Sequence, residues 1–371
     1  MSSQKVIIPH VGSLVRARSL VTVSIAADNL DSLRHHGDVD AQPGLLDFAV
    51  NVQGDGPPEW LRERLAQELS SLGAYPSAAA ELRARETVAA RHGRRPDEVL
   101  LLSGGAEGFA MLPRLGSTSA ALIHPSFTEP ELALREAGVP VTQVILEPPY
   151  LLRDAAVPES ADLVVLGNPT NPTSVLHPKV DVLALRRPGR ILVVDEAFGD
   201  AVPGEIESVA DQSLPDVLVL RSLTKTWALA GLRCGYALGA ADVLTRLTEG
   251  RAHWPLGSLQ IEAIRACCEP SAVAQSQEKA AAIARDRESL CRELRALSFS
   301  ANGISVHEPA SAPFVLLELA DGEAMRLHLR ERGIAVRRCD TFPGLGPNHL
   351  RLAVRPPHQV SILIDAMKEI L

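Results

Sequence analysis

A chain of 371 residues is too long for one ordinary hydrophobic core, so we expect about two domains. Hydrophobic residues make up 46% of the sequence and charged residues 22%, which is typical of a globular protein rather than a disordered one. The net charge of −8 argues against a general nucleic-acid binder, because neutralising phosphates requires a basic surface.

The sequence shows no sign of a membrane segment or of a disulfide framework. No apolar run approaches the roughly 20 residues that span a bilayer. The segment from Met1 to Leu20 lacks an apolar stretch followed by a small-residue cleavage site, so we expect a cytoplasmic protein. The cysteines are odd in number and irregularly spaced, which predicts neither disulfides nor a zinc site, and no metal is expected.

The N-terminal two thirds of the chain predict an arm followed by an α/β domain. Residues 1–45 read as an irregular arm, and apolar spacing predicts a helix over residues 59–72. Seven short, mostly continuous apolar runs then follow, at residues 99–102, 120–123, 141–146, 163–166, 191–194, 217–220 and 236–238. Such runs are typical of parallel strands covered on both faces, and their alternation with helical segments predicts an α/β layered domain.

The C-terminal third predicts a second unit. Residues 259–297 contain almost no glycine or proline, which predicts one long helix, or a pair, bridging two domains. Strands are expected at residues 314–319, 334–336 and 350–354, with helices at 322–332 and 357–370. We therefore divide the chain into an arm (1–45), a large domain (46–258), and an interdomain helix with a small C-terminal α/β domain (259–371).

Polar or turn residues follow several of the predicted strands, where open α/β sheets bind ligands. The glycines of residues 103–108 precede a helix and could admit an anion, although a tight turn explains them equally well. Phe127 could stack on a planar ring, although core packing is the commoner role of a lone phenylalanine. Asp195 ends a buried strand, where a carboxylate is costly unless it pairs with a cation or caps a helix.

The segment at residues 221–236 carries the strongest signal. Its two hydroxyls, a lysine and an arginine eight residues later would surround an aldehyde that carries a phosphate: Ser222, Thr224, Lys225 and Arg233. A lysine amine becomes more nucleophilic when it is partly desolvated near other cations. A surface loop fits poorly, because the neighbouring residues include tryptophan, leucine and alanine.

In their order along the chain these segments resemble the fold-type I, class I/II aminotransferase family of pyridoxal-phosphate enzymes, from about residue 46 to the C-terminus. The resemblance implies an α/β fold: a large domain with a mostly parallel seven-stranded sheet, a small C-terminal α/β domain and an N-terminal arm. It implies that Lys225 is the Schiff-base lysine, that Asp195 pairs with the pyridinium nitrogen and that Asn171 donates to the ring hydroxyl. It further implies that Phe127 stacks on the ring and that the phosphate is held by Ser222, Thr224, Arg233 and the backbone at Gly105 and Ala106.

Two further residues match family positions. Tyr75 matches a tyrosine that reaches the cofactor phosphate of the neighbouring subunit, which implies a homodimer with shared active sites. Arg351 matches the arginine that binds the substrate carboxylate bidentately.

Two branches of the family compete. Three features favour threonine-phosphate decarboxylase of cobalamin biosynthesis: residues 36–38 followed by 46–51, Phe198 where a tyrosine is usual in histidinol-phosphate aminotransferases, and residues 337–345. We therefore predict decarboxylation of L-threonine O-3-phosphate to aminopropanol phosphate. The alternative is transamination of histidinol phosphate, or of a related amino acid, with 2-oxoglutarate.

Substrate contacts are expected from four residues. Arg337 and Arg351 would orient the substrate, His36 would bind a substrate phosphate, and Asn51 lies in a loop near the substrate in the family. That loop reads Asn51-Val52-Gln53-Gly54 and departs from the N-x-N-P of the decarboxylase branch. Two other classes are disfavoured: a transcriptional regulator with this fold would need a helix-turn-helix domain that the short arm cannot hold, and a nucleotide-binding protein would need a P-loop lysine.

Overall fold

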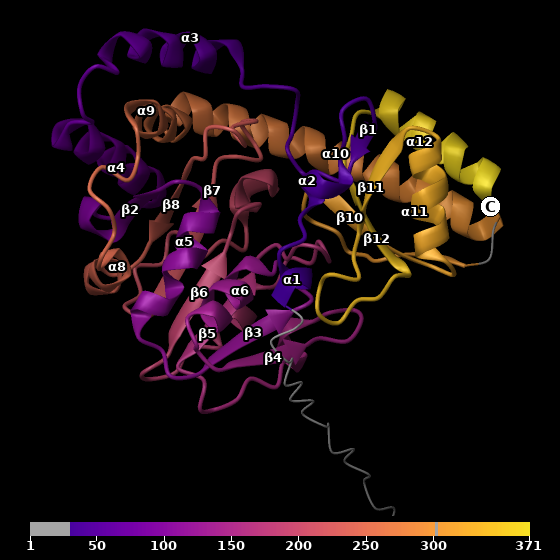
Figure 1. Cartoon of the computed structure of the whole chain (residues 1–371), viewed down its shortest axis with the longest axis horizontal. Coiled ribbons are helices and arrows are strands. Elements are labelled where there is room, and N and C mark those ends of the chain that lie inside the picture. The colour runs from indigo at the N-terminus through magenta and orange to yellow at the C-terminus, as the bar shows by residue number, and fades with distance from the viewer. Residues whose placement is uncertain (1–29, 301–302) are drawn as a thin grey trace, which may run out of the picture.

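The computed structural model describes residues 30–300 and 303–371 and places them in two lobes around two sheets (Figure 1). Of the predicted arm, residues 1–29 lie outside the described residues. Its remainder contains two short helices, α1 (Leu30–Leu33) and α2 (Gly37–Asp40).

The larger sheet has seven strands in the order β2-β8-β7-β6-β5-β3-β4. Their bounds are β2 (Val99–Leu102), β3 (Ala120–His124), β4 (Val141–Ile145), β5 (Leu163–Gly167), β6 (Ile191–Asp195), β7 (Val217–Ser222) and β8 (Gly235–Leu238). All neighbouring pairs are parallel except those of β8, which runs antiparallel to β2 and β7. The predicted fold class, a mostly parallel seven-stranded sheet in an α/β protein, is confirmed.

Both faces of this sheet are buried, which explains why its strands are continuously apolar. Alternate residues of β5 enter different cores: Val164 packs with α3 (Glu59–Glu68), α4 (Ala78–His92) and α9 (Ser258–Cys267). Leu163 packs with α5 (Gly105–Met111), α6 (Glu129–Glu136) and α8 (Ala241–Thr248) on the other face. A short helix, α7 (Lys179–Leu183), precedes β6.

The smaller sheet has the order β1-β11-β12-β10-β9. Its strands are β1 (Leu46–Phe48), β9 (Ile304–Val306), β10 (Phe314–Leu319), β11 (Ile334–Arg338) and β12 (His349–Ala353). One face packs on α10 (Pro270–Ser300), α11 (Gly322–Glu331) and α12 (Pro357–Ile370). β1 pairs in parallel with β11, so residues 46–48, which we assigned to the large domain, lie in the smaller sheet.

The predicted long helical region is a pair of helices. α9 ends at Cys267 and α10 begins at Pro270, since proline suits the first turn of a helix but not its interior. α10 contacts residues 199–201 beside the larger sheet and also β9 and α12, and in Figure 1 it extends from α9 in the larger lobe into the smaller lobe. Within residues 30–300 and 303–371, no helix has the length and apolar character that crossing a membrane requires.

Candidate active site

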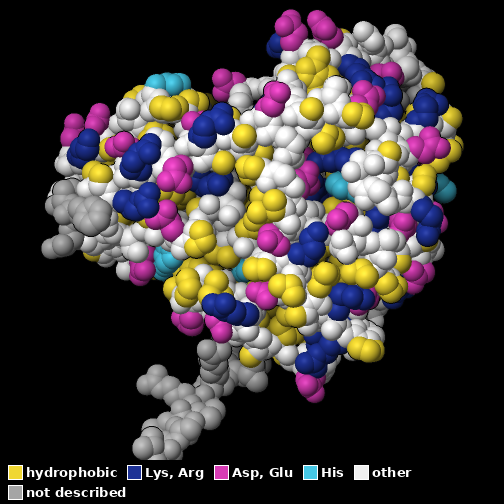
Figure 2. Space-filling model, turned by 180° about the vertical axis from the view of Figure 1, so that it is seen from behind, with side chains coloured by type: hydrophobic (Ala, Val, Ile, Leu, Met, Phe, Trp, Pro, Cys, Tyr) yellow, Lys and Arg dark blue, Asp and Glu magenta, His cyan; other side chains and the backbone are white. Residues whose placement is uncertain are grey.

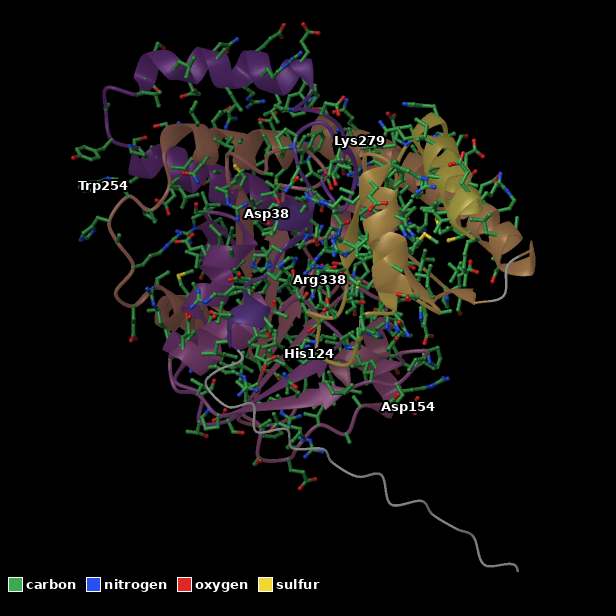
Figure 3. All side chains as sticks on the ribbon, turned by 45° about the vertical axis from the view of Figure 1, so that its right-hand side comes forward. Asp38, His124, Asp154, Trp254, Lys279 and Arg338 are labelled. Atoms are coloured by element: carbon green, nitrogen blue, oxygen red, sulfur yellow. The ribbon has the colours of Figure 1, made fainter. Side chains whose placement is uncertain are left out.

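A cavity of about 480 Å³ lies where the carboxyl ends of the larger sheet's strands meet the N-terminal segment and β12. Twelve of the predicted site residues line it: His36, Asn51, Gly105, Ala106, Phe127, Asn171, Asp195, Ser222, Thr224, Lys225, Arg233 and Arg351. They come from positions 36 to 351 of the sequence, so the fold assembles the site from both lobes. Asp38, which also lines the cavity, lies between the lobes in Figure 3.

Asp195, the last residue of β6, faces the cavity without a cationic partner at salt-bridge distance among the described residues. One of its oxygens, Oδ1, accepts a hydrogen bond of 3.0 Å from the backbone N–H of Ala197. Burial, and to a smaller extent the neighbouring Glu196 carboxylate, raise the pKa of Asp195 to about 6. A protonated ring nitrogen would supply the missing positive charge, so this carboxylate fits the pyridine ring of the cofactor.

The hydroxyls and arginine expected at the phosphate line the same cavity. Ser222 Oγ and Thr224 Oγ1 are 2.7 Å apart and hydrogen-bond to each other. Arg233 lies against the N-terminus of α5: a Cβ added to Gly104 would come within 3.0 Å of its Nη2. Glycine is required there because Gly104 also has a φ of +78°. Cation, hydroxyls and a helix N-terminus together form a donor set suited to a phosphate.

Lys225 follows β7 and is half-buried in the cavity wall, near two guanidinium groups. Burial lowers the pKa of Lys225 to about 8, and the guanidinium groups of Arg351 and Arg233 lower it further than the carboxylate of Asp195 raises it. The backbone holds this residue in place, because the N–H of Gln53 donates a 3.0 Å hydrogen bond to the carbonyl of Lys225. An amine with a pKa near neutrality can form an imine and can exchange protons.

Arg351 lies in β12 with 4% of its surface exposed and has no carboxylate partner among the described residues. Its Nη1 donates to Asn171 Oδ1, its Nη2 donates to the carbonyl of Ala49, and its Nε is buried without a partner. Burial and nearby Arg337 lower the pKa of Arg351 to about 9. A buried guanidinium beside a cavity, without an acidic partner, is suited to an anionic group of a ligand.

The N-terminal segment closes the cavity from the side opposite the strands. His36 Nε2 lies 2.5 Å from Glu129 Oε1, and the His36 ring is 5.3 Å from the ring of Phe127. Asn51 is buried, and its Oδ1 has no hydrogen-bond partner. The sequence analysis missed Asp38 and Glu129, because nothing in the sequence links a carboxylate in α6 to a histidine 93 positions earlier.

Two predicted site residues lie outside the cavity. Tyr75 is 75% exposed and stacks on Trp254, with ring centroids 4.4 Å apart, at the margin of the molecule where Figure 3 labels Trp254. Arg337 is buried, with Nη1 3.1 Å from Asp40 Oδ2 and Nη2 2.8 Å from Thr341 Oγ1. These partners satisfy the guanidinium of Arg337. The structure therefore shows Arg337 bound to neighbouring side chains and not positioned to bind a substrate.

A buried ionic cluster underlies the site and was also missed. Arg221, at the end of β7, donates to Glu196 over 2.8 Å and to Asp200 over 2.6 Å, and all three side chains are buried. Its charge is paired with these carboxylates, so Arg221 is not available to a ligand. The sequence places Arg221 directly after a predicted strand, but it does not reveal which carboxylates lie beside it in the fold.

The sequence model of the family described as "Aminotransferase class I and II" matches residues 43–367. The chain belongs to this family. It is therefore an enzyme that uses pyridoxal phosphate, as the resemblance implied, and the carboxylate of Asp195 and the donor set around Arg233 fit that group.

Relatives and solved structures extend the comparison. Proteins named histidinol-phosphate aminotransferase in Mycobacterium bovis and Mycobacterium tuberculosis are 55% identical over 363 residues, which is 97% of this chain and 96% of theirs. The threonine-phosphate decarboxylase of Salmonella typhimurium is 29% identical over 88% of this chain and 91% of its own. The crystal structure of the histidinol-phosphate aminotransferase from Clostridium acetobutylicum shares the fold, with a TM-score of 0.79 at 22% identity over 88% of this chain and 99% of that one.

The predicted threonine-phosphate decarboxylase activity is wrong. The mycobacterial relatives at 55% identity favour the alternative, an aminotransferase. One of the three features behind the prediction, residues 337–345, contributes nothing to the cavity lining, and its Arg337 binds Asp40 instead. A match in such a segment therefore carried little information about the substrate.

Proposed function

We propose that the chain is a histidinol-phosphate aminotransferase, which moves the amino group of histidinol phosphate, or of a related amino acid, to 2-oxoglutarate. The relatives at 55% identity carry that name. The structural observation that supports it is the unpaired, buried guanidinium of Arg351 at the cavity. Both proposed substrates carry an anionic group, a phosphate or a carboxylate, that a guanidinium binds through two parallel hydrogen bonds.

The cofactor contacts are part of the same proposal. Asp195 would hold the ring nitrogen in its protonated form, and Asn171, whose Oδ1 already accepts from Arg351, would present its Nδ2 to the ring hydroxyl. Phe127 would pack on the ring. Ser222, Thr224, Arg233 and the backbone at Gly105 and Ala106 would bind the phosphate. When bound, the cofactor supplies an electron sink that weakens bonds at the carbon carrying the amino group.

Lys225 is proposed both to bind the cofactor aldehyde and to move a proton. With its pKa lowered to about 8, a useful fraction of Nζ is unprotonated at neutral pH. Released from the cofactor when the substrate amine takes its place, Nζ would accept the proton from the substrate carbon. Arg351 would fix the anionic group so that this C–H bond, rather than another bond of the same carbon, faces Nζ.

Around the site, the N-terminal segment is proposed to exclude water and to contact the substrate. His36 is held in the cavity wall by its contact with Glu129, so its ring would lie where a substrate phosphate could bind. The buried Asn51 Oδ1 is an acceptor without a partner, which suits a hydrogen-bond donor of the substrate. The distribution of surface charge also suits an enzyme that acts on small molecules. On the face drawn in Figure 2, basic and acidic side chains are interspersed.

A homodimer with shared active sites is proposed from Tyr75. The exposed Tyr75 and Trp254 form a stacked aromatic pair, and an exposed aromatic pair is typical of a protein contact surface. In the dimer, the Tyr75 hydroxyl would reach the cofactor phosphate of the neighbouring subunit. The cytoplasm is the proposed location of this enzyme.

One assay tests the proposed activity. Holoenzyme is incubated with histidinol phosphate and 2-oxoglutarate, and separately with threonine phosphate, while glutamate and CO2 are measured. Glutamate formed only in the first mixture supports the proposal. CO2 from threonine phosphate, with no glutamate from either mixture, would overturn it.

A further inference from the structure

Three side chains that commonly bind metals meet on the smaller sheet, outside the cavity around Lys225. His307, Glu318 and His349 each offer a ligand atom, and these atoms all lie within 4.8 Å of one another. None of the three lines that cavity. The established family chemistry uses none of them, so their convergence calls for a separate explanation.

The sheet itself brings the three together. Glu318 of β10 lies directly opposite His349 of β12 in the antiparallel register. His307 follows β9, and its backbone N–H donates a 3.0 Å hydrogen bond to the carbonyl of Leu316 in β10. Opposite residues of antiparallel strands project to the same face with Cβ atoms about 5 Å apart. The ligand atoms are therefore positioned by three hydrogen-bonded segments, not by a loop.

One of the histidines has a nitrogen available to a ligand. His307 Nε2 is buried and has no hydrogen-bond partner among the described residues, which is costly for a polar atom. The two rings lie 6.0 Å apart between centroids, with planes 28° apart.

We propose that His307, Glu318 and His349 bind a divalent cation of the zinc class, each residue supplying one ligand. Two imidazoles and one carboxylate form a donor set that zinc accepts, whereas magnesium and calcium prefer oxygen ligands alone. The sequence analysis expected no metal, because it considered cysteine spacing and these three residues are far apart in the sequence.

Small side-chain movements would bring the ligand atoms to the spacing that zinc requires. Zinc bonds of about 2.0–2.2 Å place tetrahedral ligand atoms about 3.4 Å apart, and the three ligand atoms already lie within 4.8 Å of one another. Glu318 is exposed and can rotate freely. The N–H of Gly346 donates to His349 Nδ1 over 3.3 Å, a long bond that is easily given up. Glu318 also lines a surface hollow with Ser305 and Asn348, so this ligand can be reached from solvent.

The test uses chelator-treated holoenzyme. Zinc is titrated calorimetrically into the wild type, and magnesium into a parallel sample. The variants are His307→Ala, His349→Ala and Glu318→Gln, with His358→Ala as the matched control, because His358 is an exposed histidine of α12. X-ray absorption at the zinc edge then reports the ligand atoms.

We expect one zinc per chain in the wild type, no saturable magnesium binding, and nitrogen and oxygen ligands at about 2.0–2.2 Å without sulfur at about 2.3 Å. Each cluster variant should bind at least about 10–100-fold more weakly, since loss of even an outer partner has that effect. His358→Ala should match the wild type. Absent zinc binding, sulfur ligands, or unchanged affinity in the cluster variants would each overturn the proposal. If an alanine variant does not fold, Glu318→Gln decides, because that carboxylate is exposed.

Discussion

Arg351 donates a hydrogen bond through Nη1 to Oδ1 of Asn171, so a residue of the smaller sheet directly contacts the turn that follows β5 of the larger sheet. The proposed substrate-anion site and the proposed cofactor-ring site are therefore joined by one bond. A ligand that displaces Arg351 would therefore change the hydrogen bond to the side-chain amide of Asn171.

Arg351→Gln should lower kcat/KM for histidinol phosphate and for 2-oxoglutarate. A hydrogen bond to a charged group contributes about 1.5–3 kcal/mol, which corresponds to a loss of about 10–150-fold. Steady-state kinetics with both substrates measure this loss. Arg338→Gln is the control, because Arg338 pairs with Asp340 and does not line the cavity. Equal losses in the two variants would contradict the assignment.

Lys225→Ala should abolish covalent attachment of the cofactor and lower kcat by at least about 10²–10⁴-fold, because both the amine that bonds to the cofactor and the proton acceptor are lost. Borohydride reduction followed by peptide mass spectrometry locates the attachment in the wild type. Lys179→Ala serves as the control, since Lys179 pairs with Asp211 at the surface. Attachment that persists in Lys225→Ala would refute the role of this lysine.

Asp195 should make the cofactor-free protein less stable as pH rises through the slightly acidic range. Its pKa is raised to about 6 in the folded protein and is about 3.9 in an unfolded chain. Between these values the folded state binds more protons, so the free energy of unfolding falls with increasing pH. In urea unfolding from pH 4 to pH 7, the free energy of unfolding of the wild type should therefore fall relative to that of Asp195→Asn. Asp365→Asn, at an exposed position of α12, should follow the wild type; identical curves for all three proteins would disprove the shift.

Gly37→Ala should displace the N-terminal segment from the cavity. An added Cβ would lie 2.8 Å from the carbonyl oxygen of Ala49 and 3.5 Å from Arg351 Nη2. Overpacking of this kind costs about 1–3 kcal/mol, and the shift of Arg351 should raise KM. Gly56→Ala is the matched control, because a Cβ there meets nothing within 4 Å. Thermal unfolding and KM, measured on both variants, check the prediction, and indistinguishable variants would contradict it.

Tyr75→Phe should weaken cofactor binding by about 10–150-fold while leaving the dimer intact, because it removes one hydrogen bond to a charged phosphate and retains the aromatic ring. Cofactor titration gives the affinity, and light scattering gives the mass. A monomeric wild type would rule out the shared site.

The parts of the fold that depend on local pattern were predictable from the sequence. Most strands of the larger sheet are continuous apolar runs because both faces of the sheet are buried, and the structure has all seven predicted strands. The residues at those strand ends, such as Asp195 and Lys225, converge on one cavity because parallel strands end at the same edge.

The remainder depends on contacts between distant segments. β1 is only three residues long and carries no strand pattern, so nothing indicated that it joins the smaller sheet. Arg337 lies on the same strand pair as Arg351, yet one guanidinium is satisfied by Asp40 and the other is not. The prediction between the decarboxylase and aminotransferase branches rested on segments such as residues 337–345. The sequence does not reveal whether such segments lie near the substrate.

The pairing of β1 with β11 has a consequence for synthesis on the ribosome. Leu46 is translated long before its partner Ile334. At about 5–20 residues per second, β1 waits on the order of 15–60 seconds for a neighbour. During that interval the whole larger sheet can form. The nascent chain would therefore complete the larger sheet first, and β1 would pair with β11 only afterwards. A C-terminal fragment expressed alone would leave the β11 edge open to other chains.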